Sequence, residues 1–429
     1  MKDDMRWRPA ALAFAVAGSL VLAACGGSED SDSGGDGDGG GESQDGALTT
    51  RWEGEPAAYD DSGLVTMALW ATDTTVTEIT NDTVRSIDAA SGETRWELTP
   101  PSGAGEVCAI APELNDQGVG ALVYSVGDSD TCTLLSVVDT TAATGEPLFT
   151  QDVTPEDGLS SFVGVSVTGD TVTVTPGGTD LFRYSVAGDE LPAPEMPDAA
   201  ECQDRVNWTV GGDYLVGDVQ CDIMTEVYQL TAFDAAEGTE LWTLPERPEE
   251  WDGVAEIVPG DLLTVRTSTV EDRLLTFDEA GEVLSEVLEV QDGSEVELTL
   301  YGPNYSTIRG SLLHAAGGLG DSSERVGIDL NTGAVAWQQT FPESTTIGGD
   351  AERTMVVYQD EEYVLRAASL SPEDGAPTEL GALPDFEGEP YTSPEALVAR
   401  GDTLYVLFML SDTVTGETTA TTAAYQLSE

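Results

Sequence analysis

A pattern that recurs at a nearly fixed interval is the feature that most constrains the fold of this chain. In each copy, a short alternating strand is followed by an aspartate, a small turn, a glycine and a second strand that often contains tryptophan. Three copies are strong, and their marker positions are Asp88, Gly92 and Trp96; Asp234, Gly238 and Trp242; and Asp329, Gly333 and Trp337. A repeat of this size predicts one propeller or solenoid instead of separate domains.

Copies of the pattern fill residues 51–429. The positions equivalent to Asp234 are 88, 139, 185, 234, 278, 329, 369 and 426, so each copy takes about 47 residues. Four short strands with their turns fit into such a unit, and no stretch of the region has helical periodicity. We therefore predict an all-β, eight-bladed β-propeller. Seven blades remain the alternative, because the copies at 185 and 369 are degenerate.

Gly-Asp pairs precede several of the expected strands. The pairs are Gly169 and Asp170, Gly212 and Asp213, Gly260 and Asp261, and Gly401 and Asp402. Glycine supplies unusual backbone dihedrals in tight turns, and aspartate accepts hydrogen bonds from the local backbone. The strands expected after these turns cover 171–175, 214–217, 262–265 and 403–408.

The two ends of the repeat region complement each other. The last copy stops at the C-terminus without its outer strand, and Thr50 to Trp52 matches Thr94 to Trp96 in the outer strand of another copy. We expect the N-terminal strand to complete the last blade beside the C-terminal strands. Such pairing closes the ring and removes an open sheet edge.

The strong copies resemble the quinoprotein-type, or PQQ-like, propeller repeat, whose pattern is Ala-x-Asp-x-x-x-Gly-x-x-x-Trp. The resemblance covers residues 51–429 and implies that each tryptophan stacks against the neighbouring blade. A flat indole buries a large area with few rotatable bonds, which suits a contact between two sheets. The residues to which the resemblance gives this structural role are Trp52, Trp96, Trp242 and Trp337, with Asp88, Asp234, Asp329, Gly92, Gly238 and Gly333 in the turns.

Residues 1–24 have the features of a lipoprotein signal peptide. Lys2, Arg6 and Arg8 precede an apolar stretch over 10–24 that is too short to cross a bilayer. The run from Leu22 to Cys25 resembles the bacterial lipobox, which implies removal of the signal and diacylation of Cys25; an ordinary secretory signal is the alternative. We predict an extracytoplasmic lipoprotein on the cell membrane, with residues 25–50 as a flexible acidic Gly/Ser/Asp tether.

The other four cysteines fit an oxidising compartment. Cys108 and Cys132 fall within one repeat, and Cys202 and Cys221 fall within another. We therefore predict the bridges 108–132 and 202–221, although four cysteines allow two further pairings. Neither pair has the spacing of metal ligands, so structural disulfides are favoured over a metal site.

The acidity of the chain limits its partners. The sequence has 80 Asp and Glu against 16 Lys and Arg, a formal net charge of −64. Only seven acids lie in 26–46 and two in 1–24, which leaves 71 acids against 13 arginines in 51–429. A surface of this kind repels nucleic-acid phosphates, so no nucleic-acid partner is expected. The single histidine, His314, lies in an apolar run and is expected to be structural.

Some members of the PQQ-like family are quinone-dependent dehydrogenases, which use a carboxylate base, a calcium ion and basic groups for a tricarboxylate quinone. The arginines of this chain are scattered singly, and no hydrolase, nucleotide or zinc motif occurs. We therefore predict no catalytic, cofactor-binding or metal-binding residues. The sequence does not support binding of PQQ or of calcium.

The expected function is a monomeric, non-catalytic binding or scaffold module held at the membrane by its lipid, with an envelope protein or a small ligand as partner. Fold alone does not give function. The alternatives are a quinoprotein dehydrogenase, an envelope assembly factor and a ligand sensor. The outer-membrane protein assembly subunit of Gram-negative bacteria resembles this chain in architecture. The acidic Gly/Ser/Asp tether of this chain differs from that subunit, so we do not infer the same partner.

Overall fold

In the computed structural model, the described residues belong to one compact unit, Gln44–Glu429. The predicted signal peptide, Cys25, most of the tether and Cys202 lie outside the described residues. The structure describes residues 48–59, 67–81, 83–127, 131–156, 163–176, 179–197, 206–222, 227–244, 253–267, 273–288, 298–299, 306–317, 324–341, 345–350, 353–384, 392–411 and 417–427.

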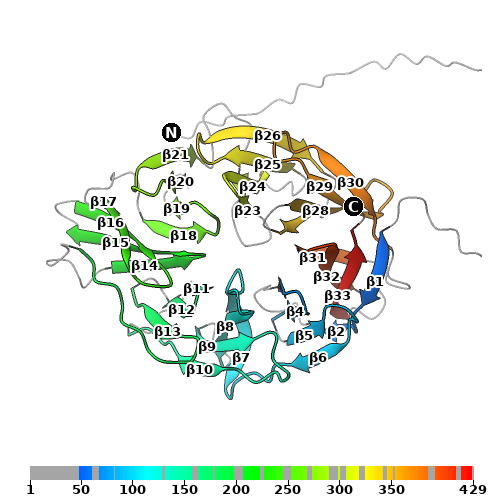
Figure 1. Cartoon of the computed structure of the whole chain (residues 1–429), viewed down its shortest axis with the longest axis horizontal. Helices are drawn as coiled ribbons and strands as arrows, with labels where there is room; N and C mark the ends of the chain where they lie inside the picture. The colour runs from blue at the N-terminus through cyan, green and yellow to red at the C-terminus, as the bar shows by residue number, and fades with distance from the viewer. Residues whose placement is uncertain are drawn as a thin grey trace, which may run out of the picture. The chain divides into compact units, whose positions relative to one another are not determined.

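The regular elements of the described residues are all β-strands, grouped into antiparallel sheets around a centre (Figure 1). The first sheet contains β3 (Ala68–Ala71), β4 (Thr75–Ile79), β5 (Val84–Asp88) and β6 (Thr94–Glu97). The second contains β7 (Ala104–Ile110), β8 (Val119–Val126), β9 (Cys132–Asp139) and β10 (Phe149–Asp152). The third contains β11 (Val163–Thr168), β12 (Thr171–Pro176) and β13 (Phe182–Ser185).

The next three sheets continue in chain order. The fourth contains β14 (Val206–Gly211), β15 (Tyr214–Asp222), β16 (Val227–Asp234) and β17 (Glu240–Leu244). The fifth contains β18 (Val254–Val258), β19 (Thr264–Thr267), β20 (Arg273–Phe277) and β21 (Val283–Leu288). The sixth contains β22 (Leu298–Thr299), β23 (Ser306–Arg309), β24 (Leu312–Gly317), β25 (Glu324–Asp329) and β26 (Ala334–Thr340).

The last sheet of the described chain is larger and has two parts. One part contains β27 (Thr346–Gly349), β28 (Thr354–Gln359), β29 (Leu365–Leu370) and β30 (Pro377–Ala382). The other contains β31 (Thr392–Arg400), β32 (Thr403–Ser411), β33 (Thr418–Gln426), β1 (Thr49–Glu53) and β2 (Ala57–Ala58). A parallel pairing of Gly349 with Val398 connects the two parts, whereas the pairing within each part is antiparallel.

The predicted joining of the chain ends is confirmed. Strand β1 pairs antiparallel with β33, with Thr50 opposite Tyr425 and Trp52 opposite Ala424. Leu48 is buried, and Thr49 and Thr50 already belong to β1, so the folded unit begins before residue 51. The fold is an all-β propeller in which the N-terminal strand completes the sheet formed by the C-terminal strands.

Three of the four expected strands begin where the Gly-Asp turns place them. Gly169, Gly212 and Gly401 have φ between 55° and 58°, the left-handed conformation that glycine adopts without strain. The fourth strand is also present, but it covers Thr264–Thr267 and so begins two residues later than predicted. At that turn, Gly260 serves a different purpose: a Cβ there would lie 2.6 Å from side-chain atoms of Ile308 in the next sheet, so close packing requires the glycine.

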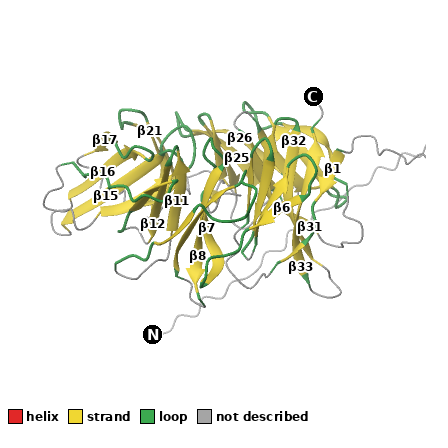
Figure 2. Cartoon of the chain, turned by 60° about the horizontal axis from the view of Figure 1, so that its bottom comes forward, coloured by secondary structure: helices red, strands yellow, loops and turns green. Residues whose placement is uncertain are grey.

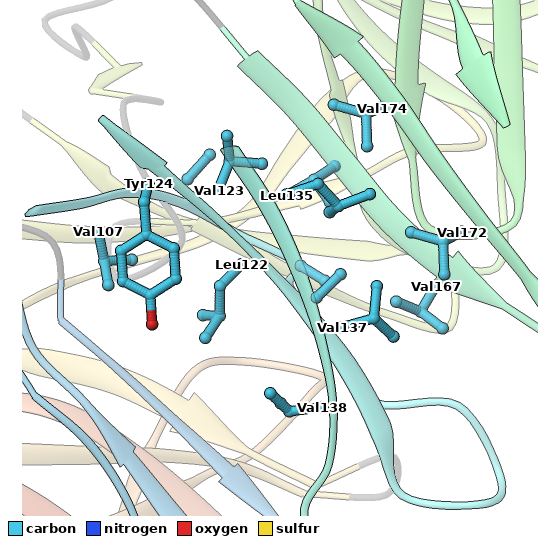
Figure 3. Close-up of a cluster of buried hydrophobic side chains, with 14 of the residues drawn as sticks. Val107, Leu122, Val123, Tyr124, Leu135, Val137, Val138, Val167, Val172 and Val174 are labelled. Atoms are coloured by element: carbon cyan, nitrogen blue, oxygen red, sulfur yellow. The ribbon is translucent and has the colours of Figure 1, made fainter. Parts of the chain in front are cut away.

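The sheets pack through apolar side chains that alternate along each strand. Figure 3 shows one such cluster, where Leu135 and Val137 of the second sheet lie toward Val172 and Val174 of the third. All four side chains are fully buried. Figure 2 shows the sheets from another side, with the loops at the ends of the strands. The strand ends, and the turns that connect them, therefore present the polar side chains from which a binding site can be built.

Candidate functional site

A central cavity of about 1760 Å³ is lined by one strand from each of the first six sheets, by one strand from each part of the last sheet, and by turns that follow these strands. These strands include β11, β14, β18, β23 and β31, which lie nearer the centre in Figure 1 than the strands that follow them. We call them the inner strands: β3, β7, β11, β14, β18, β23, β27 and β31. The turn that follows each inner strand is called an inner turn. Residues from six of these turns line the cavity, which makes it the candidate site.

The inner turns carry a series of aspartates. They are Asp73, Asp116, Asp170, Asp213, Asp261, Asp350 and Asp402, whereas the turn after β23 has Gly310 and Ser311 instead. Neighbouring inner turns are connected by hydrogen bonds: Asn115 Nδ2 donates to Gly169 O at 2.7 Å, and Tyr214 OH donates to Asp261 O at 2.9 Å. Five of the seven aspartates, Asp73, Asp116, Asp213, Asp261 and Asp350, line the cavity, whereas Asp170 and Asp402 do not.

Arginines neutralise part of this set. Asp73 pairs with Arg400 at 3.3 Å, Asp350 with Arg353 and Asp402 with Arg51. None of the ion pairs formed by the described residues includes Asp116, Asp213 or Asp261, which all line the cavity. We call these three residues the acidic arc.

The electrostatics of Asp213 show that the carboxylates of the arc affect one another. The pKa of Asp213 is raised, first by partial burial and then by the negative charges of Asp234, Asp261 and Asp116. A like charge nearby disfavours the ionised form of a carboxyl group. A positive charge placed among these groups would relieve that repulsion.

Further ionisable groups line the wall of the cavity. Glu256 on β18 accepts a hydrogen bond from Arg266 Nε at 3.2 Å, yet burial raises its pKa despite the opposing effect of the arginine. Burial also raises the pKa of Glu395, which lies on β31. Asp218 on β15 lines the cavity with a side chain that is 3% exposed. In total, the lining contains nine carboxylates and two guanidinium groups.

The tryptophans predicted to dock the blades lie against the turns of adjacent sheets. Trp52 Nε1 donates to Ala89 O at 2.9 Å, and Trp96 Nε1 donates to Ala142 O at 3.0 Å. A Cβ at Gly92 would approach the ring of Trp52 to 2.7 Å. The rings of Trp242 and Trp337 lie in the same way against Gly281 and Gly375. These contacts join sheets and leave all four tryptophans outside the cavity lining.

The aspartates of the strong copies stabilise their own turns. Asp88 Oδ1 accepts hydrogen bonds from the backbone N–H groups of Ala90 and Ser91, and Asp329 Oδ1 accepts one from Asn331 N at 2.9 Å. These backbone bonds hold the pKa of Asp88 and of Asp329 below the ordinary aspartate value. Asp234 accepts a bond from Glu237 N at 2.7 Å.

The glycines of the strong copies all have positive φ, but they do not all lie beneath a tryptophan. A Cβ at Gly238 would instead meet the guanidinium group of Arg183 at 2.5 Å, and Gly333 faces Ser285 and Val287. Arg183 Nη2 donates to Ala235 O and Ala236 O at 3.0 Å, so a buried arginine takes the place of tryptophan here. Sequence reasoning missed Arg183, because it lies on the third strand of its sheet and outside the repeat pattern.

The disulfide between Cys108 and Cys132 is present as predicted, and it connects β7 with β9 across β8. Cys108 also lines the cavity, so this bridge fixes part of the cavity wall. The predicted partner of Cys221 is Cys202, which lies outside the described residues, so the second bridge stays a prediction.

His314 has a structural environment. Its side chain is 1% exposed, its Nε2 lies 3.0 Å from Thr354 Oγ1, and its ring is 5.4 Å from that of Trp337. These contacts place it between the sixth sheet and β28, outside the cavity lining. Within the described ranges, no three or more His, Cys, Asp or Glu side chains gather as metal ligands would, and no helix is long and apolar enough to span a membrane.

Comparison with solved structures supports the fold. The quinohemoprotein alcohol dehydrogenase ADHIIG from Pseudomonas putida HK5 aligns with a TM-score of 0.50 and 13% identity, over 89% of this chain and 76% of that one. The C-terminal WD40 domain of Sif2 aligns with a TM-score of 0.49 and 10% identity, over 90% of this chain and 99% of that one. No protein-family model matches the sequence, and no curated protein matches it. At such low identity, the likeness to the dehydrogenase supports the β-propeller fold alone.

Proposed function

We propose that this chain is a membrane-anchored, extracytoplasmic lipoprotein whose PQQ-like propeller binds a cationic ligand in its central cavity without catalysing a reaction. The observation that carries the proposal is the cavity lining, in which carboxylates outnumber guanidinium groups nine to two. A cleft lined by charges of one sign concentrates the electric field and raises the local concentration of oppositely charged ligands. The acidic arc supplies negative charge that no described arginine neutralises.

The proposed architecture has eight blades. Seven sheets are formed by the described strands, and the nine-stranded one has two antiparallel parts connected by the pairing of Gly349 with Val398. Counting these parts as separate blades gives one blade for each of the eight sequence copies. The inner strands of both parts then contribute to the cavity, β27 through Ile347 and β31 through Glu395.

The lining does not suit the quinone of the related dehydrogenases. That cofactor carries three carboxylates and requires basic groups around it. Arg266 and Arg400 are the cavity arginines of the described chain, and they pair with Glu256 and Asp73. A tricarboxylate in this cavity would face net repulsion, so the charge of the wall favours a binding role over quinone-dependent catalysis.

Binding of a cationic probe tests the proposal. We expect spermidine, a linear tricationic amine, to bind the full-length protein in isothermal titration calorimetry. Replacing both Asp213 and Asp261 with asparagine should weaken its affinity at least about tenfold, which corresponds to ~1.4 kcal/mol. The matched control is Glu237→Gln with Glu279→Gln, which removes the same charge from exposed turns of the same two sheets outside the cavity. Equal affinity of both double variants would contradict a cavity site.

The same titration should depend on pH. Because the pKa values of Asp213, Glu256 and Glu395 are raised, these groups take up protons at a higher pH than ordinary carboxyls do. Protonation removes the negative charge that attracts the cation, so affinity should fall as the pH is lowered from about 7 toward the ordinary carboxyl range near about 4. An affinity that stays constant over this range would exclude these carboxylates from the site.

A further inference from the structure

The contact between the first and last sheets differs from contacts between consecutive sheets, because the two sheets that meet come from opposite ends of the chain. Apolar side chains of both sheets meet there, among them Val76, Ile87, Tyr405 and Ala424. On the rim, Trp52 of β1 lies against the turn that contains Ala89. We call this contact the closure seam.

A buried ion pair lies inside the closure seam. Arg85 Nη2 donates to Glu78 Oε2 at 2.9 Å, and the side chains are 7% and 0% exposed. Thr422 of β33 donates its hydroxyl to the same carboxylate oxygen at 2.7 Å. Among the ion pairs that the described residues form, only this one has both side chains less than a tenth exposed.

Buried polar contacts between consecutive sheets are mostly of another kind. Ser86 Oγ donates to Thr140 O at 3.1 Å, and Ser285 Oγ donates to Leu330 O. Arg183 also donates to backbone carbonyls of the next sheet. Every residue has a backbone carbonyl, so a hydrogen bond to a carbonyl does not depend on which side chains the partner sheet carries. Such contacts therefore select only weakly between one partner sheet and another. The bond from Thr422 to Glu78 requires a particular side chain on each sheet, and it joins residues 344 positions apart.

Chain connectivity explains why this contact needs selectivity. Consecutive sheets follow each other along the chain and meet at high effective concentration. The first and last sheets meet only after the whole chain has been ordered, while other sheets with similar apolar faces compete for the same surface. In the native seam, Glu78 Oε1 and Arg85 Nε already lack a hydrogen-bond partner. A wrong sheet would also remove the hydroxyl of Thr422 from Glu78 Oε2, and each further unsatisfied atom of a buried charge is costly.

We propose that Glu78, Arg85 and Thr422 form a recognition element that selects the last sheet as the neighbour of the first and so fixes ring closure in the correct register. Replacing a buried ion pair by apolar residues of similar volume is often neutral for stability, whereas its removal can lower the specificity of folding. The element therefore acts on the choice of partner more than on the stability of the closed ring.

The double variant Glu78→Leu with Arg85→Met tests this assignment in the full-length protein. We expect its native fraction to melt within a few degrees of wild type. After unfolding and dilution from denaturant, its yield of native monomer should fall by about twofold or more, with the remainder in oligomers or misclosed species. Size-exclusion chromatography with light scattering measures the yield, and limited proteolysis distinguishes closed from misclosed monomers.

Two single variants make the result decisive. Thr422→Val keeps the ion pair but removes the bond across the closure seam, and it should also lower the yield. Ser285→Ala removes a hydroxyl bond between consecutive sheets, and its yield should equal that of wild type. A wild-type yield of native monomer for the double variant and for Thr422→Val would overturn the proposal. Failure of the double variant to fold at all would also overturn it, because the pair would then serve stability.

Discussion

Replacing Trp242 with alanine is expected to lower the free energy of unfolding by about 3–5 kcal/mol, the range for removal of a buried tryptophan. The indole is 8% exposed, its ring centroid lies 5.0 Å from that of Phe277, and the ring lies against Gly281 in the next sheet. Truncation would leave a cavity between the fourth and fifth sheets. The turn at Gly281 cannot easily move inward to fill this cavity, because its backbone has a φ of 80°, a conformation that only glycine adopts without strain.

The measurement is a thermal or denaturant melt of Trp242→Ala beside Leu241→Ala. Leu241 is the preceding residue on β17 and is 44% exposed, so its truncation should change stability much less. Affinity for spermidine should persist in both variants under native conditions, because neither residue lines the cavity. Unchanged stability of Trp242→Ala would show that this tryptophan does not dock the blades.

Changing Cys25 to serine is expected to move the protein from the membrane to the soluble fraction. The lipobox-like run that ends at Cys25 implies an acyl anchor on that sulfur, and serine has no thiol to carry the diacylglyceryl group. A lipid anchor contributes about 0.8 kcal/mol for each buried methylene, so loss of the acyl chains removes most of the membrane affinity.

Fractionation of cells that produce each form, followed by detection of the protein in both fractions, measures the effect. Ser33→Ala, within the predicted tether, is the matched control and should remain with the membrane. Retention of Cys25→Ser in the membrane fraction at the wild-type level would contradict the lipid anchor.

Much of the fold could be predicted because its determinants are local or repeated. Aspartate and glycine in the turns fix short-range backbone geometry, and the recurrence of this pattern indicates sheets around a ring. The closing strand followed from the match between Thr50–Trp52 and Thr94–Trp96, and β1 pairs with β33 as expected. The bridge between Cys108 and Cys132 followed from their place in one repeat.

The site could be predicted only in part. Sequence placed Asp170, Asp213, Asp261 and Asp402 in turns, but it could not show which of them an arginine neutralises. Asp402 pairs with Arg51, which comes from the far end of the chain, while Asp261 faces the cavity without such a partner. The contact of Thr422 with Glu78 likewise depends on two sheets meeting after the ring has closed.

Native mass spectrometry of the full-length protein purified from its native source tests the central claim most directly. We expect a bound species that is a cation in solution, present on the wild-type protein and lost when Asp213 and Asp261 are both replaced by asparagine. The variant Glu237→Gln with Glu279→Gln should retain it. A bound polycarboxylate such as a quinone cofactor, held equally by all three proteins, would contradict a cation-binding cavity.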